Sequence, residues 1–139
     1  MSGYVIVDKD ALNLPTLFGP NTVTAIDEKI ISGSGKATIN NKKICVKNDE
    51  KSVSINATYF SSSFPVPGTG KITIASLAAD QVVDYATAET KIIVKGSSFT
   101  AQFTPQSPAK SPQGVPDPAT GPISAVGSFI NSQSFVTAK

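Results

Sequence analysis

Paired carboxylates and a single cysteine are the side chains of this sequence best suited to chemistry. The acidic pairs are Asp8/Asp10, Asp27/Glu28 and Asp49/Glu50. Two carboxylates suffice for glycoside hydrolysis when they face each other across a cleft. Neighbouring residues of a strand point to opposite faces, so only Asp8 and Asp10 are expected to share a face, where they could bind calcium. Surface charge at strand ends explains all three pairs at least as well.

The absence of histidine removes most other catalytic chemistry. It excludes nucleophiles activated by histidine and every zinc site that contains histidine. Cys45 cannot close a metal site alone, and although Lys43 and Lys47 could lower its pKa, we interpret it as a small strand residue. The glycines of SGSGK and PGTGK lack the spacing of a phosphate-binding loop. We therefore predict no catalytic, cofactor-binding or metal-binding residues, and no enzyme.

The charge pattern argues against a nucleic-acid partner. All twelve basic residues are lysines, ten residues are acidic, and the net charge is +2. Without arginine the chain lacks the planar donor group that reads guanine or clamps phosphate. One cysteine excludes an internal disulfide, the first residues do not form a signal peptide, and no stretch approaches about 20 apolar residues. We expect a protein made in the cytoplasm.

Alternating apolar residues predict a mainly β fold. The 139 residues fit a single domain, and short strand patterns recur between loops rich in Gly, Pro, Asn and Ser. A tight hairpin is expected to turn at Asn40 and Asn41, and the run KIIVK at 91–95 is expected to be covered on both faces. One short helix over 77–89 is left open. Residues expected to face inward are Val53, Ile55, Ala57, Ile72, Ile74, Phe99, Ala101 and Phe103.

Six of the ten prolines lie between residues 104 and 122. Proline stiffens the chain and lacks the ladder donor, which predicts an extended strap that covers or bridges other elements. A ligand for a proline-recognising module is the alternative interpretation. Residues 123–139 alternate again and are expected to return as a final strand or tail. We recognise no internal repeat.

The series SGSGKATINNKKICVKNDEKSV resembles the loop, strand, turn, strand and corner of PAAR-like spike-tip proteins of contractile injection systems, such as type VI secretion and phage-tail-like devices. The segments FPVPGTGKITIASLAADQ and KGSSFTAQFTPQSPAKSP extend the resemblance over most of residues 30–113. Asn41 and Asn48 stand where that family has glycine. PAAR tips often bind zinc through three histidines and a cysteine, a site that cannot be carried over here.

The resemblance implies a compact, conical PAAR-like fold over residues 1–139 and a structural role. Such a protein caps and sharpens a trimeric β-helical spike, one copy per trimer, and helps to pierce the target envelope. It is assembled on the device, is ejected on contraction, meets the target membrane transiently, and an effector or cargo is a further partner. The base that docks on the trimer is expected to be pseudo-threefold. Candidate docking residues are Ile72, Ile74, Ile92, Val94, Phe99 and Phe103.

Two other functions remain open from the sequence. A β-sandwich carbohydrate-binding or adhesin module would use Tyr4, Tyr59 or Tyr85 against sugar rings, although the chain has no tryptophan. A small hydrolase would depend on carboxylates such as Asp8, Asp49 and Asp84.

Overall fold

The centre of the molecule is a sheet of antiparallel strands curled into a barrel. The computed structural model describes residues 3–83, 91–118, 121–133 and 137–138. The sheet has the order β2-β12-β11-β8-β7-β4-β3, and every neighbouring pair is antiparallel. Its strands are β2 (Ala11–Asn13), β3 (Leu17–Phe18), β4 (Asn21–Ala25), β7 (Ile55–Phe60), β8 (Gly68–Ser76), β11 (Phe99–Ser107) and β12 (Ile123–Ile130).

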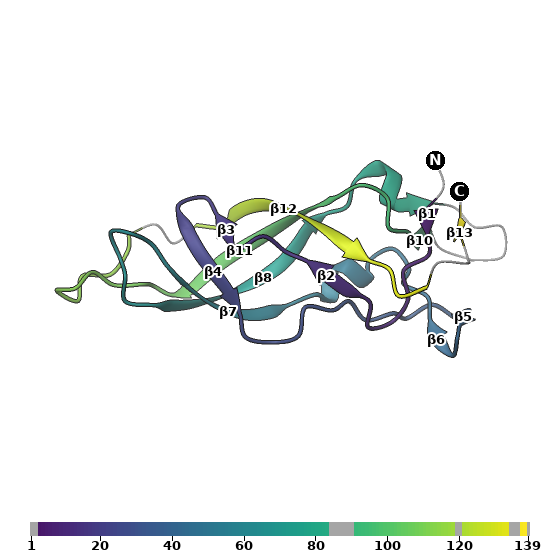
Figure 1. The fold of residues 1–139 in the computed structure, drawn as a ribbon, viewed down its shortest axis with the longest axis horizontal. Coiled ribbons are helices and arrows are strands. Elements are labelled where there is room, and N and C mark those ends of the chain that lie inside the picture. Colours follow the sequence, from purple (N-terminus) through teal and green to yellow (C-terminus); the bar gives the residue numbers. More distant parts are fainter. Residues whose placement is uncertain (1–2, 84–90, 119–120, 134–136, 139) are drawn as a thin grey trace.

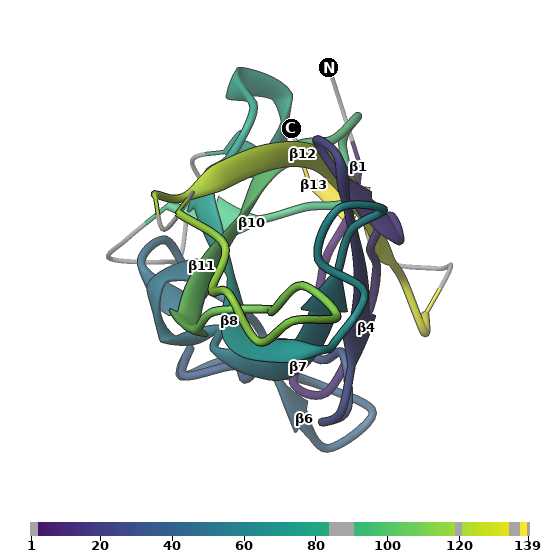
Figure 2. The same ribbon diagram turned by 90° about the vertical axis from the view of Figure 1, so that its left-hand side faces the viewer.

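The two edges of this sheet belong to one stretch of chain, residues 11–18. Its first part, β2, pairs with β12, and its second part, β3, pairs with β4. Because only three residues separate β2 from β3, the sheet must bend round until its edges meet. Figure 2 shows the resulting barrel, seen from one end. Closure leaves no long free edge on which another chain could add a strand.

Aromatic side chains fill the barrel. Phe103 packs against Phe18 and Tyr59, with ring centroids 6.1 and 5.0 Å apart, and Phe99 packs against Phe129 at 5.0 Å. All five rings are buried. In strands β7, β11 and β12, which carry four of these rings, every second side chain faces inward. This alternation places the aromatic side chains on the inner face of the barrel.

Three two-stranded ribbons lie at one end of the barrel, on the right in Figure 1. They pair β1 (Gly3–Tyr4) with β13 (Thr137–Ala138), β5 (Thr38–Ile39) with β6 (Lys42–Lys43), and β9 (Val82–Val83) with β10 (Ile92–Ile93). The first ribbon joins the two ends of the chain. Two short 3-10 turns, η1 (Asp49–Ser52) and η2 (Ala79–Gln81), lie between the ribbons and the barrel strands in the sequence.

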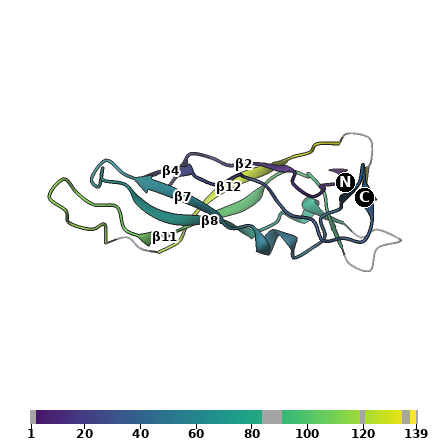
Figure 3. The same ribbon diagram turned by 90° about the horizontal axis from the view of Figure 1, so that it is seen from below.

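Two loops make the narrow opposite end, which we call the proline-braced end (residues 61–67 and 108–118). Figures 1 and 3 show both loops extending beyond the barrel. Val66 and Lys110 exchange two backbone hydrogen bonds of 2.9 Å, which hold one loop against the other. The amide of Ala109 donates to the hydroxyl oxygen of Tyr59 at 3.0 Å, so the second loop is also anchored to the barrel core. Proline limits the remaining backbone freedom of both loops.

The β-rich fold predicted from the sequence is confirmed. The residues expected to face inward are buried, and so are Ile92, Ile93 and Val94 in the run expected to be covered on both faces. Of the short helix left open over 77–89, the described residues show only the 3-10 turn η2 at 79–81, followed by the strand β9 at 82–83, where Val83 is buried. The remainder of that range, 84–89, lies outside the described residues.

Replacement of Gly70 by alanine should destabilise the barrel. A Cβ atom at this position of β8 would lie 2.5 Å from both the ring of Phe103 and the carbonyl oxygen of Thr104. The strands would have to move apart, so we expect the free energy of unfolding to fall by about 1–3 kcal/mol, measured by urea denaturation. Gly121→Ala is the matched control, because its Cβ would meet nothing within 4 Å. Equal losses in the two variants would contradict this packing.

Candidate functional site: a ring of three strand segments

Three short segments from distant parts of the chain meet where the ribbons join the barrel. They are residues 5–7, 44–46 and 92–94, with the sequences VIV, ICV and IIV. The first two follow β1 and β6 directly, and the third includes β10. We call these nine residues the ring.

Backbone hydrogen bonds join the three segments in a closed cycle. The amide of Ile6 donates to the carbonyl of Ile93 at 3.0 Å, that of Ile93 donates to Cys45 at 2.9 Å, and that of Cys45 donates to Ile6 at 2.8 Å. Each central residue therefore donates once and accepts once. Isolated bridges repeat the cycle at the flanking positions, between Val5 and Val94, Val7 and Ile44, and Val46 and Ile92. The ring consequently has pseudo-threefold symmetry although it is built from one chain.

The ring lies between two apolar cores. The side chains of its central residues, Ile6, Cys45 and Ile93, are fully buried and belong to the barrel core. The flanking residues alternate to the other side, where they form a second buried cluster together with Val83. That cluster comprises Val5, Val7, Ile44, Val83, Ile92 and Val94, with Val46 packed against it. Packing on both faces makes the ring difficult to deform.

A left-handed turn follows each segment at the same position. The second residue after the segment is Lys9, Asn48 or Gly96, with φ of 67°, 88° and 52°. Glycine and asparagine tolerate this conformation well, whereas for lysine it is uncommon. The next residue is Asp10, Asp49 or Ser97.

Two of these turns are closed by a carboxylate. Asp10 Oδ2 accepts from the amide of Val7 at 2.9 Å, and Asp49 Oδ2 accepts from the amide of Val46 at 2.8 Å. In the third unit the amide of Val94 instead donates to the carbonyl of Gln81 at 2.9 Å. The same backbone donor is thus satisfied in all three units, as the burial of the ring requires.

Each turn leads into antiparallel strands of the barrel. The first is followed by β2, β3 and β4, the second by β7 and β8, and the third by β11 and β12. The chain therefore repeats one plan three times: a ring segment, a left-handed turn and barrel strands. The expectation of no internal repeat was wrong. The signal was present as VIVDKD, ICVKND and IIVKGS, but the copies are short, unequally spaced and different in their polar residues.

Buried amide side chains also support the ring. Gln81 donates its Nε2 to the carbonyl of Lys95 at 3.1 Å, and Gln133 donates its Nε2 to the carbonyl of Val5 at 3.0 Å. Both side chains are buried. They connect η2 to the residue that follows the third ring segment, and the loop after β12 to the first ring segment. Sequence reasoning did not identify either residue, because glutamine has no distinctive spacing in such places.

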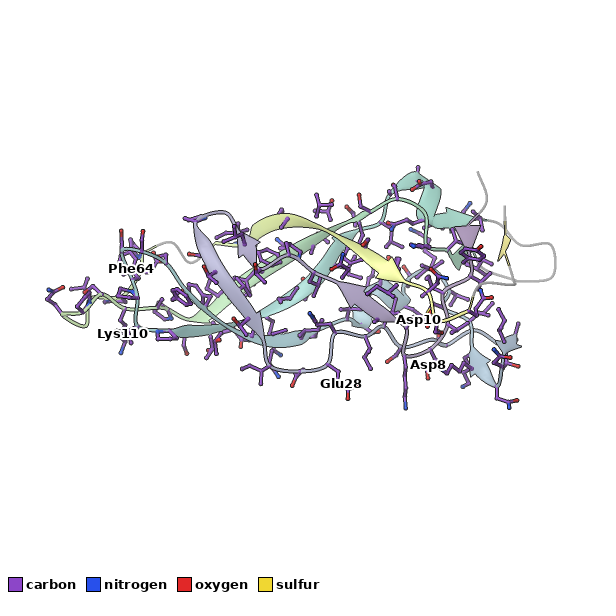
Figure 4. The ribbon with its side chains drawn as sticks, viewed as in Figure 1. Asp8, Asp10, Glu28, Phe64 and Lys110 are labelled. Carbon is purple, nitrogen blue, oxygen red and sulfur yellow. The ribbon has the colours of Figure 1, made fainter. Side chains whose placement is uncertain are left out.

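Five of the carboxylates singled out in the sequence, Asp8, Asp10, Asp27, Asp49 and Glu50, accept hydrogen bonds within the chain. Asp8 Oδ1 accepts from the amide of Gly33 at 2.8 Å, and Glu50 Oε1 accepts from the amide of Asn48 at 2.6 Å. Asp27 accepts from the backbone and side chain of Asn56, on the barrel. Figure 4 shows Asp8 and Asp10 near the ring, while Glu28 lies beside the barrel and Phe64 and Lys110 lie at the proline-braced end. No group of three potential metal ligands occurs among the described residues.

Burial raises the pKa of the Cys45 thiol well above its ordinary value, and the charges of Asp49, Asp10 and Asp8 raise it further. The suggestion that neighbouring lysines could lower this pKa was wrong, because the side chain points into the barrel core while Lys43 and Lys47 are exposed. The thiol is therefore protonated at neutral pH and unsuited to nucleophilic or metal-binding work.

The proposed docking residues divide into two groups. Ile92 and Val94 belong to the ring and its second apolar cluster. The other four, Ile72, Ile74, Phe99 and Phe103, are buried in the barrel core on β8 and β11. Asn40 and Asn41 have φ of 53° and 66° and form the turn between β5 and β6 at the ribbon end.

The tyrosines proposed for sugar binding do not form a platform in the described structure. Tyr59 is fully buried and its hydroxyl is engaged by Ala109. Tyr4 is 37% exposed and lies in β1. Tyr85 and the carboxylate Asp84 lie outside the described residues. Among those that are described, no helix is long and apolar enough to cross a membrane.

Asp49→Ala should weaken the ring. This carboxylate accepts three hydrogen bonds, from the amides of Val46 and Ser34 and from the hydroxyl of Ser34. Their loss leaves the Val46 amide without its acceptor, so we expect unfolding to require about 1–3 kcal/mol less free energy in urea. Glu28→Ala removes an exposed carboxylate from the barrel side and should change stability by less than about 0.5 kcal/mol. A comparable effect of both changes would argue against this role of Asp49.

The thiol of Cys45 should report opening of the ring. Because only the thiolate attacks a disulfide reagent, the raised pKa and the burial both slow the reaction in the native protein. We expect labelling by an aromatic disulfide at pH 8 to be slower than in the urea-unfolded chain by a factor on the order of 100 or more. Immediate labelling of the folded protein would show that the ring opens freely.

Comparison with protein families shows a match over the whole chain. The family is described as contractile injection system spike tip protein, and residues 1–139 are matched. No match was found among curated proteins. The β-rich fold and the match over every residue agree with the resemblance seen in the sequence, and the chain belongs to the contractile injection system spike tip family.

Proposed function

We propose that this chain is the structural cap of a trimeric β-helical spike, that one copy sits on each trimer, and that its ribbon end forms the base. The observation that carries this proposal is the closed cycle of hydrogen bonds among Ile6, Cys45 and Ile93. A single chain has no need of threefold symmetry for its own folding. It does need it to present three similar surfaces to three identical partners.

The location of the ribbons supports the same orientation. All three lie at one end of the molecule, as Figure 1 shows, and the proline-braced loops lie at the other. The end of a trimeric β-structure presents unpaired backbone donors and acceptors, which short strands of a cap can pair. Three ribbons around a pseudo-threefold axis offer such strands in the required arrangement.

The proline-braced end is the part that we propose to lead into the target envelope. Its loops are joined by the Val66–Lys110 bonds and fastened to the core through Tyr59. Few rotatable backbone angles remain in such a segment, because proline fixes its own φ and restricts the preceding residue. A force applied to this end is transmitted along the barrel strands to the ring.

We propose a mechanical and not a catalytic role. The carboxylates nearest the ring accept backbone hydrogen bonds, and the only cysteine is buried with a raised pKa. None of these groups is arranged as an acid and a base across a cleft. Assembly on the device, ejection on contraction, brief contact with the target membrane and carriage of an effector are expected consequences of the role.

Two insertions of equal length test the orientation of the cap. A flexible glycine-serine segment between Asn40 and Asn41 would project from the ribbon end and should prevent docking by steric exclusion. The same segment between Gln113 and Gly114 would project from the proline-braced end and should leave docking intact. Both sites are exposed turns, so both variants are expected to fold.

The readout is native mass spectrometry after co-expression with the trimeric spike protein of the same injection system. The unmodified chain and the 113/114 insertion should give one copy per trimer, and the 40/41 insertion should give none. Loss of the complex only for the 113/114 insertion would reverse the orientation. If even the unmodified chain forms no complex, the capping role is wrong.

A further inference from the structure

Lysine side chains gather at the ribbon end of the molecule. The barrel and the proline-braced end contain only Lys29, Lys71 and Lys110 among the described lysines. The other described lysines lie in the ribbons, the ring turns and the loops that lead to them: Lys9, Lys36, Lys42, Lys43, Lys47, Lys51, Lys91 and Lys95. Five described carboxylates lie at the same end, so an excess of lysines there makes it the more positive end of the described structure.

The carboxylates nearest the ring are less exposed than the lysines around them. Asp10 and Glu50 are buried, and Asp8 and Asp49 accept bonds from backbone amides. The lysines next to the ring are exposed, including Lys42, Lys43, Lys47 and Lys95. The carboxylate oxygens therefore face backbone amides, while the lysine side chains extend into solvent.

The pseudo-threefold plan places lysines at equivalent positions. Lys43 and Lys91 each precede the first residue of their ring segment, and Lys47 and Lys95 each follow the last. The first unit has Tyr4 and Asp8 at these positions. Two of the three units thus carry a lysine at each end of the ring segment.

From this pattern we infer that the spike end that receives the base carries a rim of carboxylates, repeated once in each of its three subunits. This inference rests on the proposed function and adds the chemistry of the partner surface. Lysines at a rim attract an opposite charge during approach and set the orientation, while the apolar and backbone contacts supply most of the affinity. A like-charged rim on the partner would oppose docking at the same sites.

The inference is tested by measuring binding to the purified spike trimer of the same system. The association rate is measured by biolayer interferometry at low and high salt. We expect association to slow by about tenfold or more between about 0.05 and about 0.5 M NaCl, because salt screens the attraction. We expect Lys43→Glu and Lys95→Glu each to slow association at low salt by about threefold to tenfold. Lys110→Glu, at the opposite end, is the matched control and should change it by less than about twofold.

The outcomes separate the inference from the capping role. One copy bound per trimer, with no dependence on salt and no difference between Lys43→Glu and Lys110→Glu, would overturn the carboxylate rim and leave capping standing. No binding at any salt concentration would overturn both. Thermal unfolding of each variant verifies its fold, and if a charge reversal does not fold, the salt dependence of the unmodified chain decides the question alone.

Discussion

Three amides and three carbonyls, one of each from Ile6, Cys45 and Ile93, satisfy one another in a closed cycle, and the arrangement of the molecule depends on it. A buried backbone group must find a partner, and strands this short cannot form a conventional ladder. When three of them join in a ring, each central residue donates one backbone hydrogen bond to one neighbouring segment and accepts one from the other. The ribbons, the left-handed turns and the barrel strands are all connected to these three segments.

The cycle also explains how stiffness arises in a chain that has a single cysteine and, in its described part, no α-helix. Alternation directs the central ring residues into the barrel core and their neighbours into the second cluster, so the ring is packed on both faces. The carboxylates of Asp10 and Asp49 then hold the turns that leave it. Displacement of one segment would break hydrogen bonds to both others and open two cores together, which makes the structure cooperative.

Symmetry in a single chain links the fold to the role. Repetition of one supersecondary plan gives the ring its pseudo-threefold symmetry, which the proposed capping role would use to meet three identical subunits, while the rest of the molecule remains free to differ. The proline-braced loops belong to the second and third hairpins only, so the narrow end does not follow the repeat. The molecule is therefore symmetric where it would meet a symmetric partner and asymmetric where it would not.

Local pattern in the sequence was sufficient to determine the β-rich class of the fold, the inward faces of Ile72, Ile74, Phe99 and Phe103, the turn at Asn40 and Asn41, and the absence of histidine chemistry. These features depend on alternation, backbone preference and residue type, which act over a few neighbours. Closure of the barrel, burial of the Cys45 thiol and the cycle through Ile6 and Ile93 were decided only by the tertiary structure. They join residues that are far apart in the chain through backbone atoms, and backbone atoms are the same for every sequence.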